Sequence, residues 1–137
     1  VIVDPVVRID VDTDRARLRD EVLRLRPRLL VLDPFVRLHR IDENAAAEVA
    51  PLLAYLRALQ RELGCAVVLV HHARKGGHAR AGQALRGSSE LHAWGDSNLY
   101  LRRDREQLLL SIEHRAAAGV TGIELELAER RGGLALH

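Results

Sequence analysis

Two short runs of apolar residues, Leu29–Leu32 and Ala66–Val70, stand out in the hydrophobic pattern of this sequence. Between them, from about Asn44 to Leu63, apolar residues recur at helical spacing, and Gly64 follows directly. This spacing predicts an amphipathic helix that ends at a glycine. Uninterrupted apolar runs are typical of strands that are covered on both faces, as in a parallel sheet. The pattern therefore predicts a strand–helix–strand unit with parallel strands.

Weaker signals precede this unit and interrupt it. Val1–Val3 is a β-branched run that predicts the end of a buried strand. A helix should follow, capped by Thr13 or Asp14 and stopped by Pro27. Pro51 lies inside the second helical pattern, where proline is unfavourable, so we expect either a kink there or a main helix that begins just before it.

The sequence changes character after the second apolar run. Residues 73–89 are rich in Gly, Ala and Arg without apolar periodicity, and they predict a long surface loop. Beyond it, Asn98–Leu101, Leu108–His114 and Ile123–Leu127 predict strands, the first two joined by a turn at Arg103-Asp104-Arg105. This order predicts the α/β class, with a parallel sheet flanked by helices and antiparallel strands at the C-terminal end.

The composition is that of a folded globular protein. The 137 residues fit one domain, with 47% hydrophobic residues, 29% charged residues and a net charge of +2. Lys75 is the only lysine, and either genomic base composition or phosphate contacts can explain the many arginines. The single cysteine, Cys65, excludes an internal disulfide framework and makes the cytoplasm the expected location. No apolar stretch has the length of a membrane span, and we expect no signal peptide.

Polar residues that could carry chemistry follow both predicted parallel strands. Ligands of open α/β sheets bind at the carboxyl ends of these strands, where Asp33 and the pair His71-His72 are expected. Asp33 can serve as a Mg²⁺ ligand or simply cap a turn. A histidine after the second strand can contact a γ-phosphate, or the pair can be polar strand-end residues bonded to backbone. A zinc site is disfavoured because adjacent histidines on a strand point in opposite directions.

Basic residues mark two further candidate sites. Arg74, Lys75, Arg80 and Arg86 lie in the predicted loop without an intervening acidic residue, as in loops that bind polyanions. The loop contains no aromatic residue for base stacking, so a solvated loop is an equal alternative. Arg115 follows a predicted strand, where it can reach a phosphate of a neighbouring subunit or form a surface ion pair.

From Leu29 to about Arg115 the sequence resembles the second half of the ATPase core of the RepA-like and DnaB-like hexameric replicative helicases, a branch of the RecA superfamily. The motifs are LLVLDPFVRLHRIDEN, VVLVHHARKGG, ALRGSSELHAWGDSNLYL and LLLSIEHRAA. The combination is more specific than any single part. The resemblance implies a RecA-like P-loop ATPase fold, ATP and Mg²⁺ as cofactors, contact with single-stranded DNA, and a homo-oligomeric ring that could be a hexamer.

The resemblance also implies roles for individual residues. Asp33 matches the Walker B aspartate that holds Mg²⁺ through water, and His72 matches the γ-phosphate sensor, with His71 as the alternative. Arg74 to Ala84 corresponds to the segment that can touch single-stranded DNA, and it contains Arg74, Lys75 and Arg80. Arg86 opens an Arg-Gly-Ser-Ser segment on the nucleotide side. Arg115 matches the arginine finger that reaches the nucleotide of the adjacent subunit.

The sequence departs from this family pattern in two respects. One is local: no arginine stands at Asp96-Ser97, where some relatives place one, so the finger assignment rests on Arg115. The other is larger. The sequence contains no GxxxxGKS or GxxxxGKT loop, whose backbone and lysine supply most of the phosphate-binding energy. It also opens at Val1 without any methionine, which indicates a truncated or non-standard start. We therefore expect residues 1–137 to form a single, incomplete RecA-like domain that does not hydrolyse ATP alone. The alternative is a non-catalytic nucleic-acid-binding or scaffolding module, and the sequence does not separate a helicase from a recombinase or a regulatory ATPase.

Overall fold

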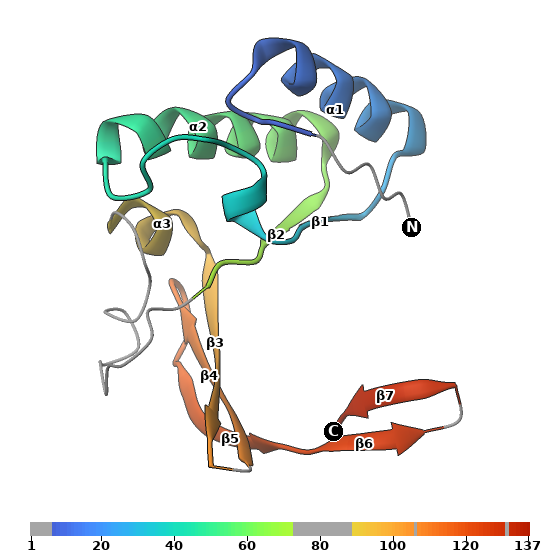
Figure 1. The fold of residues 1–137 in the computed structure, drawn as a ribbon, viewed down its shortest axis with the longest axis vertical. Helices are drawn as coiled ribbons and strands as arrows, with labels where there is room; N and C mark the ends of the chain where they lie inside the picture. The colour runs from blue at the N-terminus through green and yellow to red at the C-terminus, as the bar shows by residue number, and fades with distance from the viewer. Residues whose placement is uncertain (1–6, 73–88, 106, 131) are drawn as a thin grey trace. The chain divides into compact units, whose positions relative to one another are not determined.

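The computed structural model describes residues 7–72, 89–105, 107–130 and 132–137, drawn in colour in Figure 1. The chain divides into two compact units, with residues 7–72 and 89–91 in the first and the later described residues in the second. The first contains α1 (Asp12–Leu25), β1 (Leu29–Leu32), the 3-10 turn η1 (Phe35–Arg37), α2 (Ala46–Leu63), β2 (Ala66–Leu69) and the start of α3 (Ser89–Trp94). The predicted strand at Val1–Val3 lies outside the described residues.

β1 and β2 form a parallel pair in which Leu29 lies opposite Ala66 and Leu32 opposite Leu69. α2 is the crossover helix between the two strands, and it packs with α1 over one face of the pair (Figure 1). Parallel strands require such a crossover because the end of the first strand and the start of the second lie at opposite edges of the sheet. The predicted parallel strand–helix–strand unit is confirmed.

The core of the first unit lies between α2 and the sheet. α2 buries Val49, Leu52, Leu53, Leu56 and Leu59, the apolar positions that its helical spacing predicts. The opposite face of the strand pair is exposed, since Leu29, Val31 and Val68 keep 51%, 52% and 45% of their surface accessible. Parallel strands are normally covered on both faces, so this sheet has an apolar face that no described residue of its unit covers.

Both predicted helices exist, with corrected beginnings. α1 starts at Asp12 after Val11, so neither Thr13 nor Asp14 is its N-terminal cap. Asp14 lies in the first turn of α1, and its side chain instead accepts a 2.9 Å hydrogen bond from the backbone N–H of Arg8, which precedes the helix. α2 ends at Gly64 in the left-handed conformation, as predicted. It begins at Ala46 and passes through Pro51, so of the two alternatives the start just before Pro51 is wrong and the kink stays a prediction.

The second unit is built from antiparallel strands. β3 (Ser97–Asp104), β4 (Gln107–His114) and β5 (Val120–Leu125) form a three-stranded sheet, and β6 (Leu127–Arg130) pairs with β7 (Gly133–Leu136). Three predicted strands are thereby confirmed, although the one expected at Ile123–Leu127 spans the boundary between β5 and β6. The β6–β7 hairpin was not predicted, and neither was α3. With its helix-flanked parallel pair and later antiparallel strands, the chain has the predicted α/β fold class.

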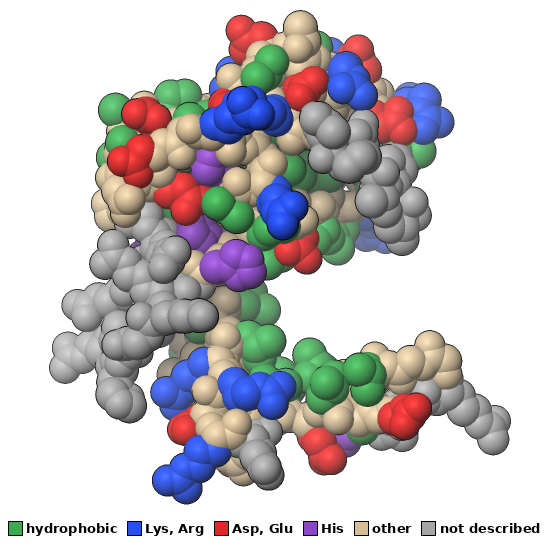
Figure 2. All heavy atoms as spheres, viewed as in Figure 1, with side chains coloured by type: hydrophobic (Ala, Val, Ile, Leu, Met, Phe, Trp, Pro, Cys, Tyr) green, Lys and Arg blue, Asp and Glu red, His purple; other side chains and the backbone are tan. Residues whose placement is uncertain are grey.

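Hydrophobic side chains remain on the surface of the second unit, and Figure 2 shows them over its hairpins. They come from several strands: Leu99, Leu101, Val120, Leu127, Leu134 and Leu136. Leu99 and Leu101 of β3 share one face with their half-buried partners on β4, Ile112 and Leu110. Among the described helices, none is long and apolar enough to cross a membrane.

Candidate functional site

The carboxyl ends of β1 and β2 form one edge of the parallel pair. Val70 follows β2 and donates its backbone N–H to the carbonyl of Leu32 at 2.9 Å, and its own carbonyl accepts from the N–H of Phe35 at 2.8 Å. Asp33 lies between these two contacts and has an exposed side chain. His72 follows Val70 by two residues and is also exposed. The two strand ends thus present a carboxylate and an imidazole to solvent at the same sheet edge.

His71 differs from its neighbour because its side chain is turned inward. Only 9% of the side chain is exposed, and Nε2 lies 3.5 Å from Oε2 of Glu43. Nδ1 lies 2.9 Å from the backbone carbonyl of His72, which can only accept a hydrogen bond. The predicted pair of histidines is therefore divided between one buried ring and one exposed ring.

Glu43 bridges two histidines from different parts of the chain. Its Oε1 lies 3.3 Å from Nε2 of His39, and its Oε2 faces His71. The ring of Phe35 lies 4.3 Å from the His39 ring and 6.2 Å from the His71 ring, centroid to centroid. We call Phe35, His39, Glu43 and His71 the Glu43 cluster. It joins the segment after β1 to the residues after β2.

The polar side chains of the Glu43 cluster are buried although several of their nitrogen and oxygen atoms have no hydrogen bond within the described part of the chain. The side chain of His39 is 2% exposed and that of Glu43 is 16% exposed. Both ring nitrogens of His39, Nε2 of His71 and Oε1 of Glu43 lack a hydrogen bond of normal geometry to any described residue. Burial lowers the pKa of His39 below its ordinary value of 6.5, although Glu43 and Asp10 oppose the shift. The cluster therefore depends on close charge–imidazole contacts in an apolar setting.

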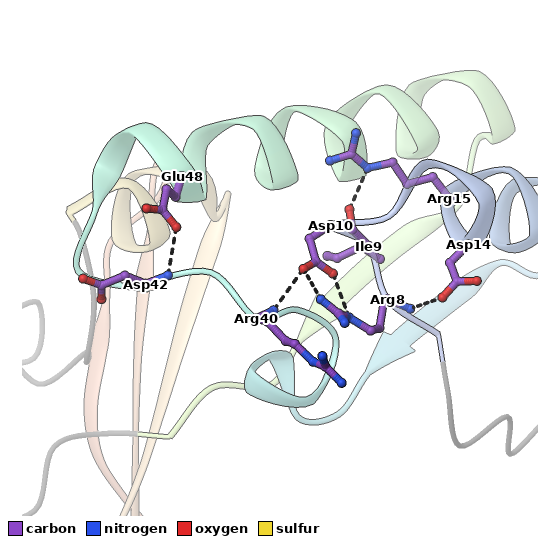
Figure 3. Close-up of polar contacts among 8 residues, drawn as sticks. All are labelled: Arg8, Ile9, Asp10, Asp14, Arg15, Arg40, Asp42 and Glu48. Atoms are coloured by element: carbon purple, nitrogen blue, oxygen red, sulfur yellow. Dashed lines mark hydrogen bonds and ion pairs between the residues drawn. The ribbon is translucent and has the colours of Figure 1, made fainter.

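A network of backbone and side-chain contacts holds the segment that carries His39 and Glu43 (Figure 3). Ile9 donates its N–H to the carbonyl of Leu38 at 2.8 Å, and Arg40 donates its N–H to Asp10 at 3.1 Å. The Arg8 side chain also pairs with Asp10. Burial tends to raise the pKa of Asp10, but hydrogen bonds from Arg8 and Arg40 outweigh it and lower the pKa. The residues before α1 thus anchor the loop between η1 and α2.

Arg115 belongs to the second unit and follows β4. Its backbone N–H bonds to the carbonyl of Asp96 at 3.0 Å, and its guanidinium donates to the carbonyl of Ala93 near the end of α3. Nη1 also lies 3.5 Å from Asp96, while 60% of the side chain remains exposed. The arginine thus binds the carboxyl end of α3, where a cation is favourable.

A polar group lies next to Arg115 on the second unit. Tyr100 donates its hydroxyl hydrogen to Glu113 at 2.9 Å, and Nε2 of His92 lies 3.0 Å from the same carboxylate oxygen. Hydrogen bonds from His92 and Tyr100 lower the pKa of Glu113 despite partial burial. Burial and the bond to Glu113 raise the pKa of Tyr100 well above its ordinary value of 10.0, so the phenol stays protonated. We assign these residues a structural role in joining α3, β3 and β4.

The remaining candidate residues, Arg74, Lys75, Arg80 and Arg86, lie outside the described residues. Within the described ranges, no group of three or more His, Cys, Asp or Glu side chains could hold a metal ion. A hydrated Mg²⁺ needs fewer protein ligands, since it keeps several waters and takes one or two carboxylates. The exposed carboxylate of Asp33 at the strand end is compatible with that requirement.

A helix-covered parallel strand pair with polar residues at its carboxyl edge defines an α/β protein whose strand ends lie where open sheets bind their ligands. Residues 3–78 match the family model of an AAA domain, a span that includes Asp33, the Glu43 cluster and His72. The match covers more than half of the chain, and the chain belongs to this family of AAA-type ATPases.

The strand-end residues follow from the sequence pattern, whereas no pattern in the sequence assigned a role to His39 or Glu43. Glu43 is part of the Asp-Glu-Asn segment that carried the family resemblance, and His39 precedes it by four residues. Spacing of four residues brings side chains together on a helix, but His39 and Glu43 lie in the segment between η1 and α2. Their partner His71 comes from beyond the next helix. Only the folded chain brings the three together.

Proposed function

We propose that this chain supplies the Walker B half of an ATP-hydrolysing, RecA-like domain of a RepA/DnaB-like DNA helicase or a related DNA-associated ATPase. Residues 1–137 would form one incomplete domain of that kind. The observation that supports the proposal best is the shared sheet edge, where the exposed Asp33 and His72 follow adjacent parallel strands. Membership of the AAA domain family supports the ATPase part of the proposal.

The two strand-end residues have complementary roles in this proposal. The Asp33 carboxylate would hold a hydrated Mg²⁺ that accompanies ATP, and the metal would neutralise charge on the phosphates. The His72 imidazole would donate a hydrogen bond to the γ-phosphate and so distinguish triphosphate from diphosphate. Both groups are exposed at positions that the strands fix, as a preorganised site requires.

ATP turnover also needs a phosphate-binding loop, and the sequence contains no GxxxxGKS or GxxxxGKT motif. We propose that another segment supplies this loop together with strands that pack against the parallel pair. The exposed apolar face formed by Leu29, Val31 and Val68 is consistent with such additional elements. The 137-residue chain alone is then expected neither to bind ATP tightly nor to hydrolyse it.

The remaining roles come from the resemblance and concern a homo-oligomeric ring. Arg74, Lys75 and Arg80 would contact single-stranded DNA, and Arg86 would lie on the nucleotide side. Arg115 would act as the arginine finger toward the neighbouring subunit. In the free chain its guanidinium bonds to Ala93, so it would have to exchange that carbonyl for a phosphate.

The test is ATP hydrolysis by a complete domain, in which this chain is joined to the segment that carries the phosphate-binding loop. Asp33→Ala should lower turnover at least about 100-fold, since the metal contact acts on developing phosphate charge. Asp20→Ala, which removes an exposed carboxylate on α1, is the matched control and should leave turnover unchanged. Equal activity of the Asp33→Ala protein and the control would refute the proposal.

A second candidate function is a non-catalytic module that keeps the fold and binds nucleic acid or another RecA-like subunit. The absence of a phosphate-binding loop motif in the sequence favours it. It predicts that the 137-residue chain binds single-stranded DNA with affinity that falls steeply with salt and does not respond to ATP. Fluorescence anisotropy with a labelled oligonucleotide, at two salt concentrations and with or without Mg-ATP, distinguishes the two functions.

A further inference from the structure

We infer that Glu43 is a positioning residue whose carboxylate keeps the His71 ring inside the first unit, so that His72 is the histidine presented at the sheet edge. The inference rests on the proposed function in one respect, namely that the outward histidine would meet the nucleotide. The contact that carries it is the Glu43 carboxylate set between His39 at 3.3 Å and His71 at 3.5 Å.

The two consecutive histidines after β2 differ in burial, since the His71 side chain is 9% exposed and His72 is exposed. Successive side chains of an extended chain alternate between the two faces of a sheet, so one ring turns toward the core and the other away from it. Nothing in the alternation decides which histidine is which, because a shift by one residue exchanges their positions. A specific partner on the inner side must therefore make the choice.

Glu43 is that partner because its Oε2 lies 3.5 Å from Nε2 of His71, a buried nitrogen that has no hydrogen bond of normal geometry to a described residue. His71 has its Nδ1 beside the carbonyl of His72 and its Nε2 beside Glu43, with only 9% of its side chain exposed. Without the carboxylate, the buried Nε2 would lose its 3.5 Å contact with Oε2 of Glu43. The inward arrangement of His71 is favourable only while Glu43 is present.

Glu43 in turn needs both histidines. A carboxylate that is 16% exposed loses much of its hydration, and imidazoles on two sides replace it. If His71 turned outward, Glu43 would lose the contact on its Oε2 and keep the His39 contact on its Oε1. The three side chains therefore stabilise one another in a single arrangement.

The same cluster reaches the segment that carries Asp33. Phe35 contacts the rings of His39 and His71, and its backbone N–H bonds to Val70 at 2.8 Å. Asp33 precedes Phe35 by two residues, and His72 follows His71 directly. Glu43 thus acts indirectly, through Phe35 and His71, on both Asp33 and His72 at the proposed nucleotide-binding edge. A contact confined to one strand would affect only one of these two residues.

Carbethoxylation of histidines by diethylpyrocarbonate, read out by peptide mass spectrometry, tests the inference on the nucleotide-free 137-residue chain. In the wild type His72 should react at least about tenfold faster than His71, since a buried ring reacts only through local opening. In Glu43→Ala the His71 rate should rise at least about fivefold. In Glu43→Asp, which keeps the charge, His71 should remain close to the wild-type rate.

Two controls separate a positioning effect from general loosening of the fold. Cys65 is 3% exposed, and its thiol should stay protected from alkylation in Glu43→Ala if the first unit remains folded. Glu21→Gln removes an exposed carboxylate that pairs with Arg24 on α1, and it should leave every histidine rate unchanged. If Cys65 loses protection in Glu43→Ala, then Glu43→Gln replaces it, because Gln keeps the volume of the side chain and removes its charge.

The inference is overturned if wild-type His71 reacts as fast as His72, or if His71 stays protected when the Glu43 charge is removed and Cys65 remains protected. Neither outcome depends on ATP hydrolysis, because no nucleotide is present. Conversely, if Asp33→Ala leaves ATP hydrolysis by the complete domain unchanged, the proposed function is refuted. The histidine labelling pattern of the 137-residue chain is not affected by that result. The two proposals therefore fail separately.

Discussion

Phe35 connects the core of the first unit to the proposed site, and removing its ring should reveal how far the two depend on each other. The side chain is completely buried and contacts the rings of His39 and His71. Its backbone N–H bonds to Val70, and substitution with alanine preserves that bond. Phe35→Ala therefore removes only packing, which makes its consequence calculable.

Loss of a buried phenylalanine ring lowers the free energy of unfolding by about 3–5 kcal/mol. Domains of this size have unfolding free energies of about 5–15 kcal/mol. The loss in Phe35→Ala therefore amounts to between about a fifth and all of the stability. Phe35→Leu keeps most of the volume and should lose under about 1.5 kcal/mol. Val36→Ala alters the next side chain, which is 49% exposed, and should change stability by less than about 0.5 kcal/mol.

Cys65 offers a reporter that belongs to the first unit alone. It is the only cysteine, and only 3% of it is exposed, so its thiol reacts mainly when this unit opens. Thiol labelling across a urea series gives the unfolding free energy of each variant. A loss in Phe35→Ala below about 1 kcal/mol, or one equal to that of Val36→Ala, would refute the packing assigned to Phe35.

Two further predictions concern single features of the first unit. Because burial lowers the pKa of His39 below 6.5, protonation favours the unfolded chain, and stability should be full above that pH and decline as the pH falls below it. Urea unfolding at pH 7.5 and at pH 5.5, compared with His39→Asn, tests this, and an equal decline in the variant would contradict it. Gly64→Ala should cost about 1–2 kcal/mol by urea unfolding, because φ is 62° there while no atom obstructs an added Cβ. No loss would contradict the left-handed cap.

The elements that the sequence predicts best are those with a long and regular pattern. α2 and the strands on either side of it follow from helical spacing, a terminal glycine and uninterrupted apolar runs. The β6–β7 hairpin escaped prediction because apolar residues alternate without a break at Ile123, Leu125 and Leu127, across the junction of β5 and β6. Backbone hydrogen bonds between Glu126 and His137, at 2.9 and 3.1 Å, close the open end of that hairpin.

Some features of the candidate site follow from local sequence patterns, and others depend on residues that are distant in the sequence. Asp33 and the two histidines could be found because a polar residue directly after an apolar run is a local pattern, and the parallel pairing then brings them to one edge. Alternation further requires one histidine to face inward. The choice of His71 depends on Glu43, which lies before α2 and meets His71 only after that helix has returned the chain to β2. A sequence pattern can therefore indicate the strand end that carries the site, whereas the outward residue is decided by a buried partner that only the fold supplies.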